Sequence, residues 1–197
     1  MRLFVAADVA DHAREAIDAE QKRIASALDV KERDASRRAG TLKWVKRDHS
    51  HLTLVFLGDV ADGRVPAVVD AIGRGVDAPP FDIVFEGVGA FPPRGAPRVL
   101  WIGVGEGAAP LTALQQELAK RIAALGVPLE DRAFHPHLTL ARWRESRPAD
   151  RQRALAHARQ GMIARARIAG ATLYQSRLSS SGPTYTSLAR ATLTGSA

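Results

Sequence analysis

The chain has 197 residues, 46% of them hydrophobic and 25% charged, which is ordinary for a folded protein and long enough to bury a core. Its formal net charge is +7, and arginine, which suits bidentate phosphate contacts, supplies most of the positive charge, so an anionic ligand is favoured. The absence of cysteine excludes disulfides, thiolate nucleophiles and cysteine-ligated zinc.

In chain order, the first half of the sequence indicates alternating strands and helices. The apolar run that opens it is too short for a signal peptide, and no stretch reaches the ~18 apolar residues of a membrane span, so we expect a cytoplasmic protein. The charged stretch at 29–40 lacks periodicity and is expected to be a solvated loop. The expected elements are a strand at 2–7, a helix at 9–28, a strand at about 50–57, a helix at about 65–75 and a strand from residue 81.

The second half of the sequence repeats this order. The expected elements are a strand at 99–104, a helix from 110 to 125, a strand at about 136–142, an arginine-rich helix at 149–160 and paired strands at about 170–178 and 184–193. A turn-rich stretch at 91–95 separates the two halves. The repeated order predicts an internal duplication within one two-lobed domain spanning 1–197, with halves at about 1–93 and 94–197 and a pseudo-two-fold relation between lobes.

One four-residue motif, HLTL, occurs in each half, at 51–54 and at 137–140. A strand directs residues i and i+2 to the same face, so each histidine shares a face with its threonine, while the leucines point toward a core. Two such faces in one cleft would supply a general acid, a general base and two hydroxyl donors. Imidazole suits both proton roles because its unperturbed pKa is about 6.5. A core histidine has no reason to recur with the same threonine two residues later.

Two further histidines and one arginine lie close to the motifs. His49 and His135 each stand two residues before a motif histidine, and such pairs on strands can bind zinc. No carboxylate has a matching spacing, so we expect both at the rim of the site. Arg142 follows His137 by five residues, an odd offset that turns it away from the histidine in an ideal strand. It reaches a phosphate only if the strand ends or twists there; otherwise it is a solvated strand-end arginine.

Four aromatic residues are candidates for stacking on a nucleobase, as single-stranded RNA readers do. They are Phe56, Phe91, Phe134 and Tyr185. Core packing is the more common role for such residues, and it is the one we expect of the three phenylalanines. Tyr185 lies on the last expected hairpin, which approaches the cleft only if the two halves face one another.

The residues around both motifs resemble the two-histidine phosphoesterase superfamily, and within it the bacterial and archaeal RNA 2′,3′-cyclic phosphodiesterases, once called 2′-5′ RNA ligases. The resemblance covers nearly the whole chain. It rests on RLFVA at 2–6, WV at 44–45, RVLW at 98–101, FHPHLTLAR at 134–142, and LYQS at 173–176 with Tyr185. The stretch at 29–40 is longer than usual for the family, so no function is assigned to it.

The resemblance implies an α+β fold with two lobes, in which two mostly antiparallel sheets line a central cleft and the helices lie outside. It also implies hydrolysis of a terminal RNA 2′,3′-cyclic phosphate to a 2′-phosphate without a metal or another cofactor. His51 would donate a proton to the leaving 3′-oxygen, and His137 would activate water. Thr53 and Thr139 would hold the phosphate oxygens, and Arg142 is a further candidate for substrate binding.

The expected partner is RNA with a 2′,3′-cyclic phosphate end or a small cyclic nucleotide, with no membrane and no obligate protein partner. Weak reverse 2′-5′ joining would accompany hydrolysis. Two other classes of function remain open. The four histidines near the motifs could serve a metal-dependent phosphohydrolase, or the cleft could bind RNA or a nucleotide without catalysis.

Overall fold

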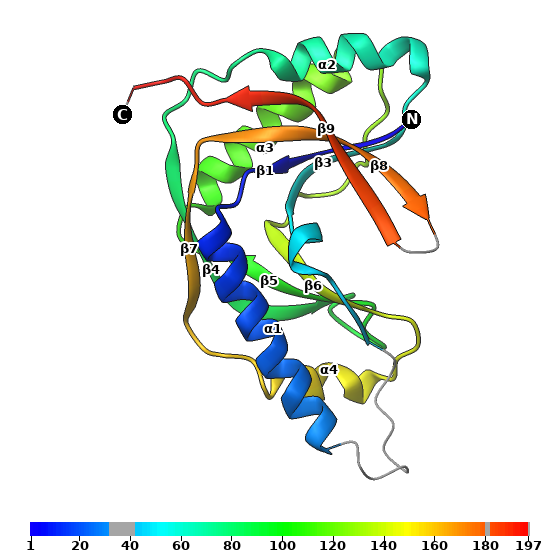
Figure 1. Cartoon of the computed structure of the whole chain (residues 1–197), viewed down its shortest axis with the longest axis vertical. Helices are drawn as coiled ribbons and strands as arrows, with labels where there is room; N and C mark the ends of the chain where they lie inside the picture. Colours follow the sequence, from blue (N-terminus) through cyan, green and yellow to red (C-terminus); the bar gives the residue numbers. More distant parts are fainter. Residues whose placement is uncertain (32–41, 180–181, 197) are drawn as a thin grey trace.

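The computed structural model describes residues 1–31, 42–179 and 182–196 (Figure 1). The helices are α1 (Asp11–Lys31), α2 (Val65–Gly73), α3 (Ala108–Ala123) and α4 (Pro148–Leu155), with short 3-10 turns η2 (Arg47–His49) and η3 (Asp62–Arg64). The strands are β1 (Arg2–Ala7), β2 (Leu42–Trp44), β3 (Leu52–Asp59), β4 (Phe81–Phe91), β5 (Val99–Val104), β6 (His137–Trp143), β7 (Met162–Ile168), β8 (Gly170–Ser179) and β9 (Gly182–Thr192). Among these helices, none is long and apolar enough to cross a membrane.

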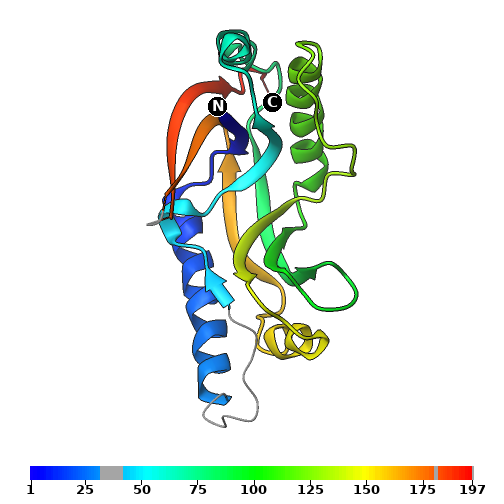
Figure 2. The same cartoon turned by 90° about the vertical axis from the view of Figure 1, so that its right-hand side faces the viewer.

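The strands form two sheets, as expected. One has the order β3-β1-β8-β9 and the other has the order β2-β6-β5-β4-β7. Every neighbouring pair in the two sheets is antiparallel. Figure 2 shows α1 and α3 on opposite sides of the molecule, outside the strands. The predicted α+β architecture of two antiparallel sheets with outer helices is therefore confirmed.

The sheet orders reveal an exchange of strands between the two sequence halves. In each sheet a motif strand (β3 or β6) pairs with the opening strand of its own half (β1 or β5). The next strand comes from the other half, because β8 pairs with β1 and β4 pairs with β5. The orders are compatible with the predicted duplication, which remains a prediction. The exchange itself was not indicated by the sequence.

Several sequence predictions need correction. The arginine-rich helix expected at 149–160 is α4, which ends at Leu155, and the short strand β2 was not predicted. Helix α1 extends to Lys31, beyond the expected end at residue 28, and the rest of the expected loop at 29–40 lies outside the described residues. The strand β7 was not predicted, because its MIARARI sequence combines arginines with alanines, which are weak strand formers. It becomes a strand by pairing with β4, and its outer edge meets α1, where the carbonyl oxygen of Arg165 lies 3.1 Å from His12 Nε2.

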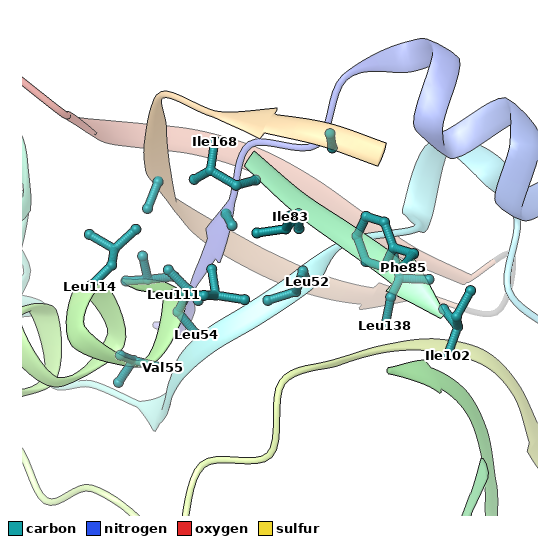
Figure 3. Packing of buried hydrophobic residues seen from close by; sticks show 14 of the residues in the cluster. Leu52, Leu54, Val55, Ile83, Phe85, Ile102, Leu111, Leu114, Leu138 and Ile168 are labelled. Carbon is teal, nitrogen blue, oxygen red and sulfur yellow. The ribbon is translucent and has the colours of Figure 1, made fainter. Parts of the chain in front are cut away.

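The leucines of both motifs are buried in one continuous core, as the alternation predicted. Leu52, Leu138 and Leu140 are fully inaccessible, and Leu54 nearly so. Figure 3 shows Leu52, Leu54 and Leu138 among side chains from β4, β5 and α3. Burying each such side chain contributes roughly 1.5–3 kcal/mol, so the opposite, polar face of each motif strand is held in a defined orientation.

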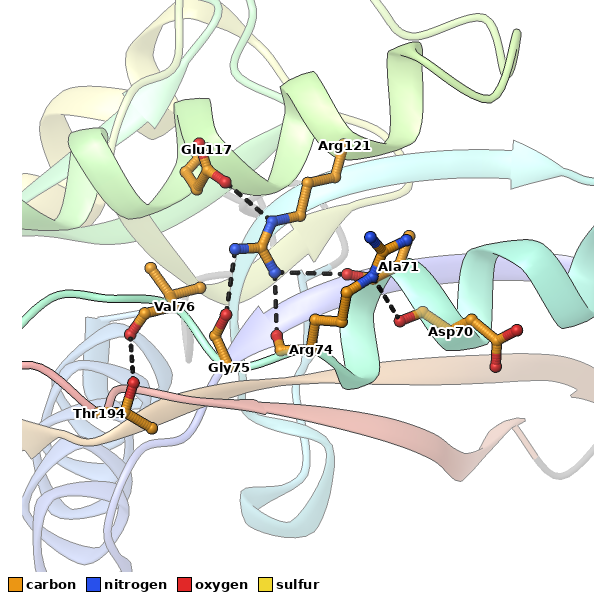
Figure 4. Close-up of polar contacts among 8 residues, drawn as sticks. All are labelled: Asp70, Ala71, Arg74, Gly75, Val76, Glu117, Arg121 and Thr194. Atoms are coloured by element: carbon orange, nitrogen blue, oxygen red, sulfur yellow. Dashed lines mark hydrogen bonds and ion pairs between the residues drawn. The ribbon is translucent and has the colours of Figure 1, made fainter.

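The junction between α2 and α3 is closed by one guanidinium group (Figure 4). Arg121 donates to the carbonyl oxygens of Ala71, Arg74 and Gly75 at 3.3, 2.9 and 3.1 Å, and to Glu117 Oε1 at 2.8 Å. The last carbonyls of a helix lack N–H partners within the helix, so Arg121 satisfies the end of α2 from α3. This contact joins two helices that come from different halves of the sequence.

Candidate active site

The two motif histidines reach the same region from different sheets. His51 immediately precedes β3, His137 begins β6, and these two strands lie beside one another. A pocket of about 600 Å³ is lined by both histidines together with Thr53, Thr139 and Arg142. The structure therefore brings all five predicted site residues to one cavity, whose volume is in the range of ligand sites.

The backbone two residues upstream orients each imidazole. His51 Nδ1 lies 2.7 Å from the carbonyl oxygen of His49, and His137 Nδ1 lies 2.7 Å from the carbonyl oxygen of His135. A carbonyl oxygen only accepts hydrogen bonds, so Nδ1 is the donor in both rings. In the neutral ring, Nε2 then carries the lone pair and can accept a proton. Both histidines have the same tautomer for the same geometric reason.

Burial depresses the basicity of both rings. Desolvation is the main cause that lowers the pKa of His51 from 6.5 to about 4, opposed by the hydrogen bond to the backbone of His49 and reinforced by the positive charge of Arg142. Desolvation likewise lowers the pKa of His137, against its hydrogen bond to the backbone of His135. Both imidazoles are thus neutral near pH 7 in the ligand-free protein.

A β-bulge places Arg142 in the cleft despite its odd offset from His137. Thr139 and Ala141 pair with consecutive residues of β5, so Leu140 is an extra residue in β6. Leu140 and Ala141 are both buried, and the strand resumes its alternation one residue late. The side chain of Arg142 consequently lies on the same face as His137. Of the two orientations that the sequence left open, the structure shows the one directed into the cleft.

The strand β3 contains the same irregularity at the corresponding position. Thr53 and Val55 pair with consecutive residues of β1, so Leu54 is the extra residue, and Leu54 and Val55 are both buried. Phe56 then occupies the place in β3 that Arg142 occupies in β6. Both side chains line the cavity. The two motif strands therefore have the same bulge, but β3 presents an aromatic side chain to the cavity at this position and β6 presents a guanidinium group.

Aromatic rings surround each motif histidine. The ring centroids of Phe4 and Tyr185 lie 4.7 and 5.2 Å from that of His51, and the centroid of Phe91 lies 5.1 Å from that of His137. Tyr185 comes from β9, one of the strands contributed by the other half of the chain. Phe4 was missed by the sequence reasoning, although alternation in β1 places it on the face opposite to the buried Leu3.

The four candidate stacking residues all line pockets. Phe56 and Tyr185 line the cavity of about 600 Å³. Phe56, Phe91 and Phe134 line an adjoining pocket of about 430 Å³, which also contains His137 and both motif threonines. Each of the four is only partly buried. Phe134 packs against the hydrophobic core, as expected, and also lines the pocket, whereas Phe56 and Phe91 line the pocket without belonging to the core cluster, so core packing is corrected for these two.

His49 and His135 line different pockets of the site. His49 lines the larger pocket, 5.3 Å from Tyr185 between ring centroids, and His135 lines the smaller one. Within the described ranges, no group of three or more histidine, cysteine or acidic side chains is arranged to hold a metal ion. The rim positions expected for His49 and His135 agree with these pocket linings.

Comparison with known proteins finds one family and several named relatives to which the chain is similar. Residues 21–178 match the model of a protein family described as the 2′-5′ RNA ligase superfamily. The RNA 2′,3′-cyclic phosphodiesterase of Archaeoglobus fulgidus is 37% identical over 75% of this chain and 76% of that protein. The one from Methanothermobacter thermautotrophicus is 32% identical over 95% of this chain and 96% of that protein.

Solved structures agree with the sequence matches. A crystal structure of a protein from Thermus thermophilus superimposes with a TM-score of 0.75 and 26% identity, covering 99% of both chains. The crystal structure of E. coli LigT complexed with 3′-AMP superimposes with a TM-score of 0.71 and 28% identity, covering 98% of both chains.

Proposed function

Because the chain belongs to the 2′-5′ RNA ligase superfamily, we propose that it hydrolyses the 2′,3′-cyclic phosphate at the end of an RNA strand to a 2′-phosphate. The relatives named RNA 2′,3′-cyclic phosphodiesterase support this enzyme class, and the structure of LigT with 3′-AMP supports a nucleotide ligand. The observation that carries the proposal is that two histidine–threonine pairs, one from each sheet, line a single cavity.

In this reaction one imidazole acts as the general base and the other as the general acid. His137 accepts a proton at Nε2 from a water molecule, whose oxygen forms the new bond to phosphorus. The bond from phosphorus to the 3′-oxygen breaks, and His51 donates its Nε2 proton to that leaving oxygen. The product is a 2′-phosphate with a free 3′-hydroxyl, and no covalent intermediate is needed. His51 therefore begins the cycle protonated and His137 begins it neutral.

The pKa values of the free protein set a condition on this assignment. Burial lowers the pKa of His51 to about 4, so its proton must be gained when the substrate binds. A bound cyclic phosphate brings a negative charge, which favours the protonated form of a nearby imidazole and raises its pKa. In the ligand-free protein, the deep burial of His51 by itself favours the reverse assignment, with His51 as the base.

The remaining proposed site residues stabilise charge on the phosphate. The hydroxyl groups of Thr53 and Thr139 donate to the non-bridging oxygens from opposite sheets. Arg142 adds a charge-assisted contact, which is roughly twice as strong as a neutral hydrogen bond. Support for these roles comes from their shared cavity with the histidines.

The same ring-opening step with an alcohol in place of water supplies a second, weaker activity. If the 5′-hydroxyl of another RNA strand replaces water, its attack on phosphorus gives a 2′-5′ linkage. The superfamily name favours this joining reaction, and we propose it as a minor activity, with the 3′-oxygen leaving as the 2′-5′ linkage forms. The cytoplasmic location expected from the sequence remains a prediction.

A single assay tests the proposed function and separates it from the alternatives. A short oligoribonucleotide with a 2′,3′-cyclic phosphate end is incubated with the protein, with and without EDTA, and the product end is identified by phosphorus NMR. We expect a 2′-phosphate at the same rate in both conditions. Loss of activity with EDTA and recovery with one divalent metal would identify a metal-dependent phosphohydrolase. Binding without turnover would identify a non-catalytic module.

A further inference from the structure

The two adjoining pockets differ in charge, and one of them is much more basic than the other. We call the larger the basic pocket and the smaller the second pocket. Both are lined by Arg132, Arg142 and a single carboxylate, Glu130, which pairs with Arg132 at 2.7 Å. The cationic residues that line only the basic pocket are Arg2, Lys43 and Lys46. Among the residues that the structure describes, no acidic, lysine or arginine side chain lines only the second pocket.

The backbone that carries the two lysines is anchored beside the site. Lys43 is the register partner of Arg142 across β2 and β6, and directly opposed residues of antiparallel strands point to the same face. Just beyond, Val45 N donates to the carbonyl oxygen of Leu140 at 2.8 Å, and Gln21 Nε2 donates to the carbonyl oxygen of Val45 at 2.8 Å. The lysines therefore project from a fixed edge of the site.

The next turn fixes the second lysine in the same way. The carbonyl oxygen of Lys46 accepts from His49 N at 2.8 Å and from Ser50 Oγ at 3.3 Å, closing the 3-10 turn that leads to His51. Both lysine side chains are exposed, and in the part of the chain that the structure describes neither forms an ion pair. Their charges are thus available to an anion that enters the basic pocket.

The terminal cyclic phosphate needs only the histidines, the threonines and Arg142. Positive charge that continues beyond that set, along one side only, matches a ligand with further phosphates on that side. Neutralising a phosphate by lysine is the main sequence-independent source of affinity for nucleic acid. A cyclic mononucleotide has no second phosphate, whereas an RNA strand has one on the 5′ side of each nucleoside.

Resting on the proposed function, we propose that Lys43 and Lys46 bind the phosphodiesters upstream of the cyclic end, so that a single RNA strand leaves the site through the basic pocket. The substrate class is then an oligoribonucleotide, and a cyclic mononucleotide is a poor substrate that uses only part of the site.

The test compares two substrates in three proteins. The substrates are 2′,3′-cyclic AMP and a five-residue oligoribonucleotide ending in adenosine 2′,3′-cyclic phosphate. The proteins are the parent, the double variant Lys43→Ala/Lys46→Ala, and a control, Lys22→Ala/Lys120→Ala, which removes the same charge at positions that line neither pocket. We expect the first double variant to lower kcat/KM for the oligomer on the order of tenfold, leaving the mononucleotide unchanged. The control should match the parent on both.

Measuring how oligomer binding depends on salt tests the lysine contacts without relying on catalytic turnover. Two phosphate contacts contribute a slope of about 1.4 in log affinity against log salt for a single strand, so raising NaCl from 50 to 200 mM should weaken oligomer binding about sevenfold more in the parent than in the lysine variant. Binding is measured by fluorescence anisotropy with a labelled oligomer that ends in a 3′-phosphate. Equal salt slopes and affinities in the parent and the lysine variant, or equal losses in the control, would overturn this proposal.

Failure of the proposed function would have a different signature. In that case neither substrate is hydrolysed by the parent, whatever the anisotropy data show. Hydrolysis of both substrates with no oligomer preference and no effect of the lysines would instead retain the phosphodiesterase and reject the strand path.

Discussion

At the scale of single residues, each motif histidine is set by its own local backbone. The carbonyl group two residues upstream fixes the tautomer of His51 and of His137, and burial keeps both rings neutral. His137 is therefore ready to act as a base, whereas His51 can act as an acid only if substrate binding raises its pKa so that the ring becomes protonated. The chemistry of these rings can be tested in two ways.

The first concerns acid stability and His51. Its folded-state pKa of about 4 lies below the 6.5 of an exposed histidine, so between these values the unfolded chain binds the extra proton. The free energy of unfolding should therefore fall as the pH is lowered through this window, by up to about 3 kcal/mol for this one group. His51→Gln removes this contribution. Urea unfolding of parent and variant at pH 4.5 to 7.5 measures the difference, and curves that stay parallel would contradict a neutral, buried His51.

The second concerns which histidine is the acid. Each single His→Ala change should cost about 10²–10⁴-fold in rate. If the 3′-oxygen of the cyclic phosphate is replaced by sulfur, the thiolate leaves without needing a proton. His51→Ala should then recover much of its rate on that substrate, whereas His137→Ala should not.

The control for this experiment is His49→Ala, which should resemble the parent on both substrates because only the backbone of His49 contacts His51 through a hydrogen bond. Recovery of His137→Ala would reverse the assignment, as the burial of the free protein favours. Recovery of neither would mean that both rings act by holding the phosphate.

At the scale of elements, the bulges in β3 and β6 decide which side chains enter the cleft. Each motif strand has one extra buried residue after its threonine, so the fifth residue after the histidine faces the site. That residue is Phe56 in one strand and Arg142 in the other. The same β-bulge thus brings an apolar ring into the cleft from one sheet and a cation from the other.

This geometry predicts the effect of removing Arg142. Its positive charge lowers the pKa of both His51 and His137, so Arg142→Ala should raise both pKa values. Loss of a charge-assisted phosphate contact should also lower kcat/KM about 10–100-fold. NMR titration of the two imidazoles and steady-state kinetics measure these effects.

Arg142→Lys is the matched control, since it keeps the charge but loses the planar fork of donors. It should keep the histidine pKa values and lose part of the activity. If Arg142→Ala changes neither the titration nor the rate, Arg142 is a solvated residue at a strand end.

At the scale of the whole molecule, the strand exchange makes the two halves interdependent. The neighbours of β4 are β5 and β7, both in the second half of the chain, and β8 joins the first-half sheet through β1. The exchange also delivers Tyr185 on β9 to the ring of His51. One half of the sequence therefore contains neither a complete sheet nor a complete site.

We accordingly expect that fragments 1–93 and 94–197 do not fold separately. Each would expose the apolar face of an incomplete sheet, so neither should show a cooperative thermal transition by circular dichroism or a dispersed NMR spectrum. Mixing the two fragments should restore both signals. Cooperative unfolding of either fragment alone would show that the exchange is not required for stability.

Much of this protein was determined by sequence patterns of short range. The HLTL motifs predicted two strands with histidine and threonine on one face and leucine in the core, because alternation in a strand depends only on neighbouring residues. Their recurrence predicted a paired site. Helix spacing and turn residues placed most helices and strands close to their positions in the structure.

What only the tertiary structure decided depends on contacts between distant parts of the chain. The register of β6 on β5 brings Arg142 into the cleft, pairing with β4 turns residues 162–168 into a strand, and pairing of β2 with β6 sets Lys43 beside the site. The depth of burial that lowers the pKa of His51 is likewise a property of the assembled lobes. These features arise because strand register and burial are fixed by residues far apart in sequence, whose pairing no local period encodes.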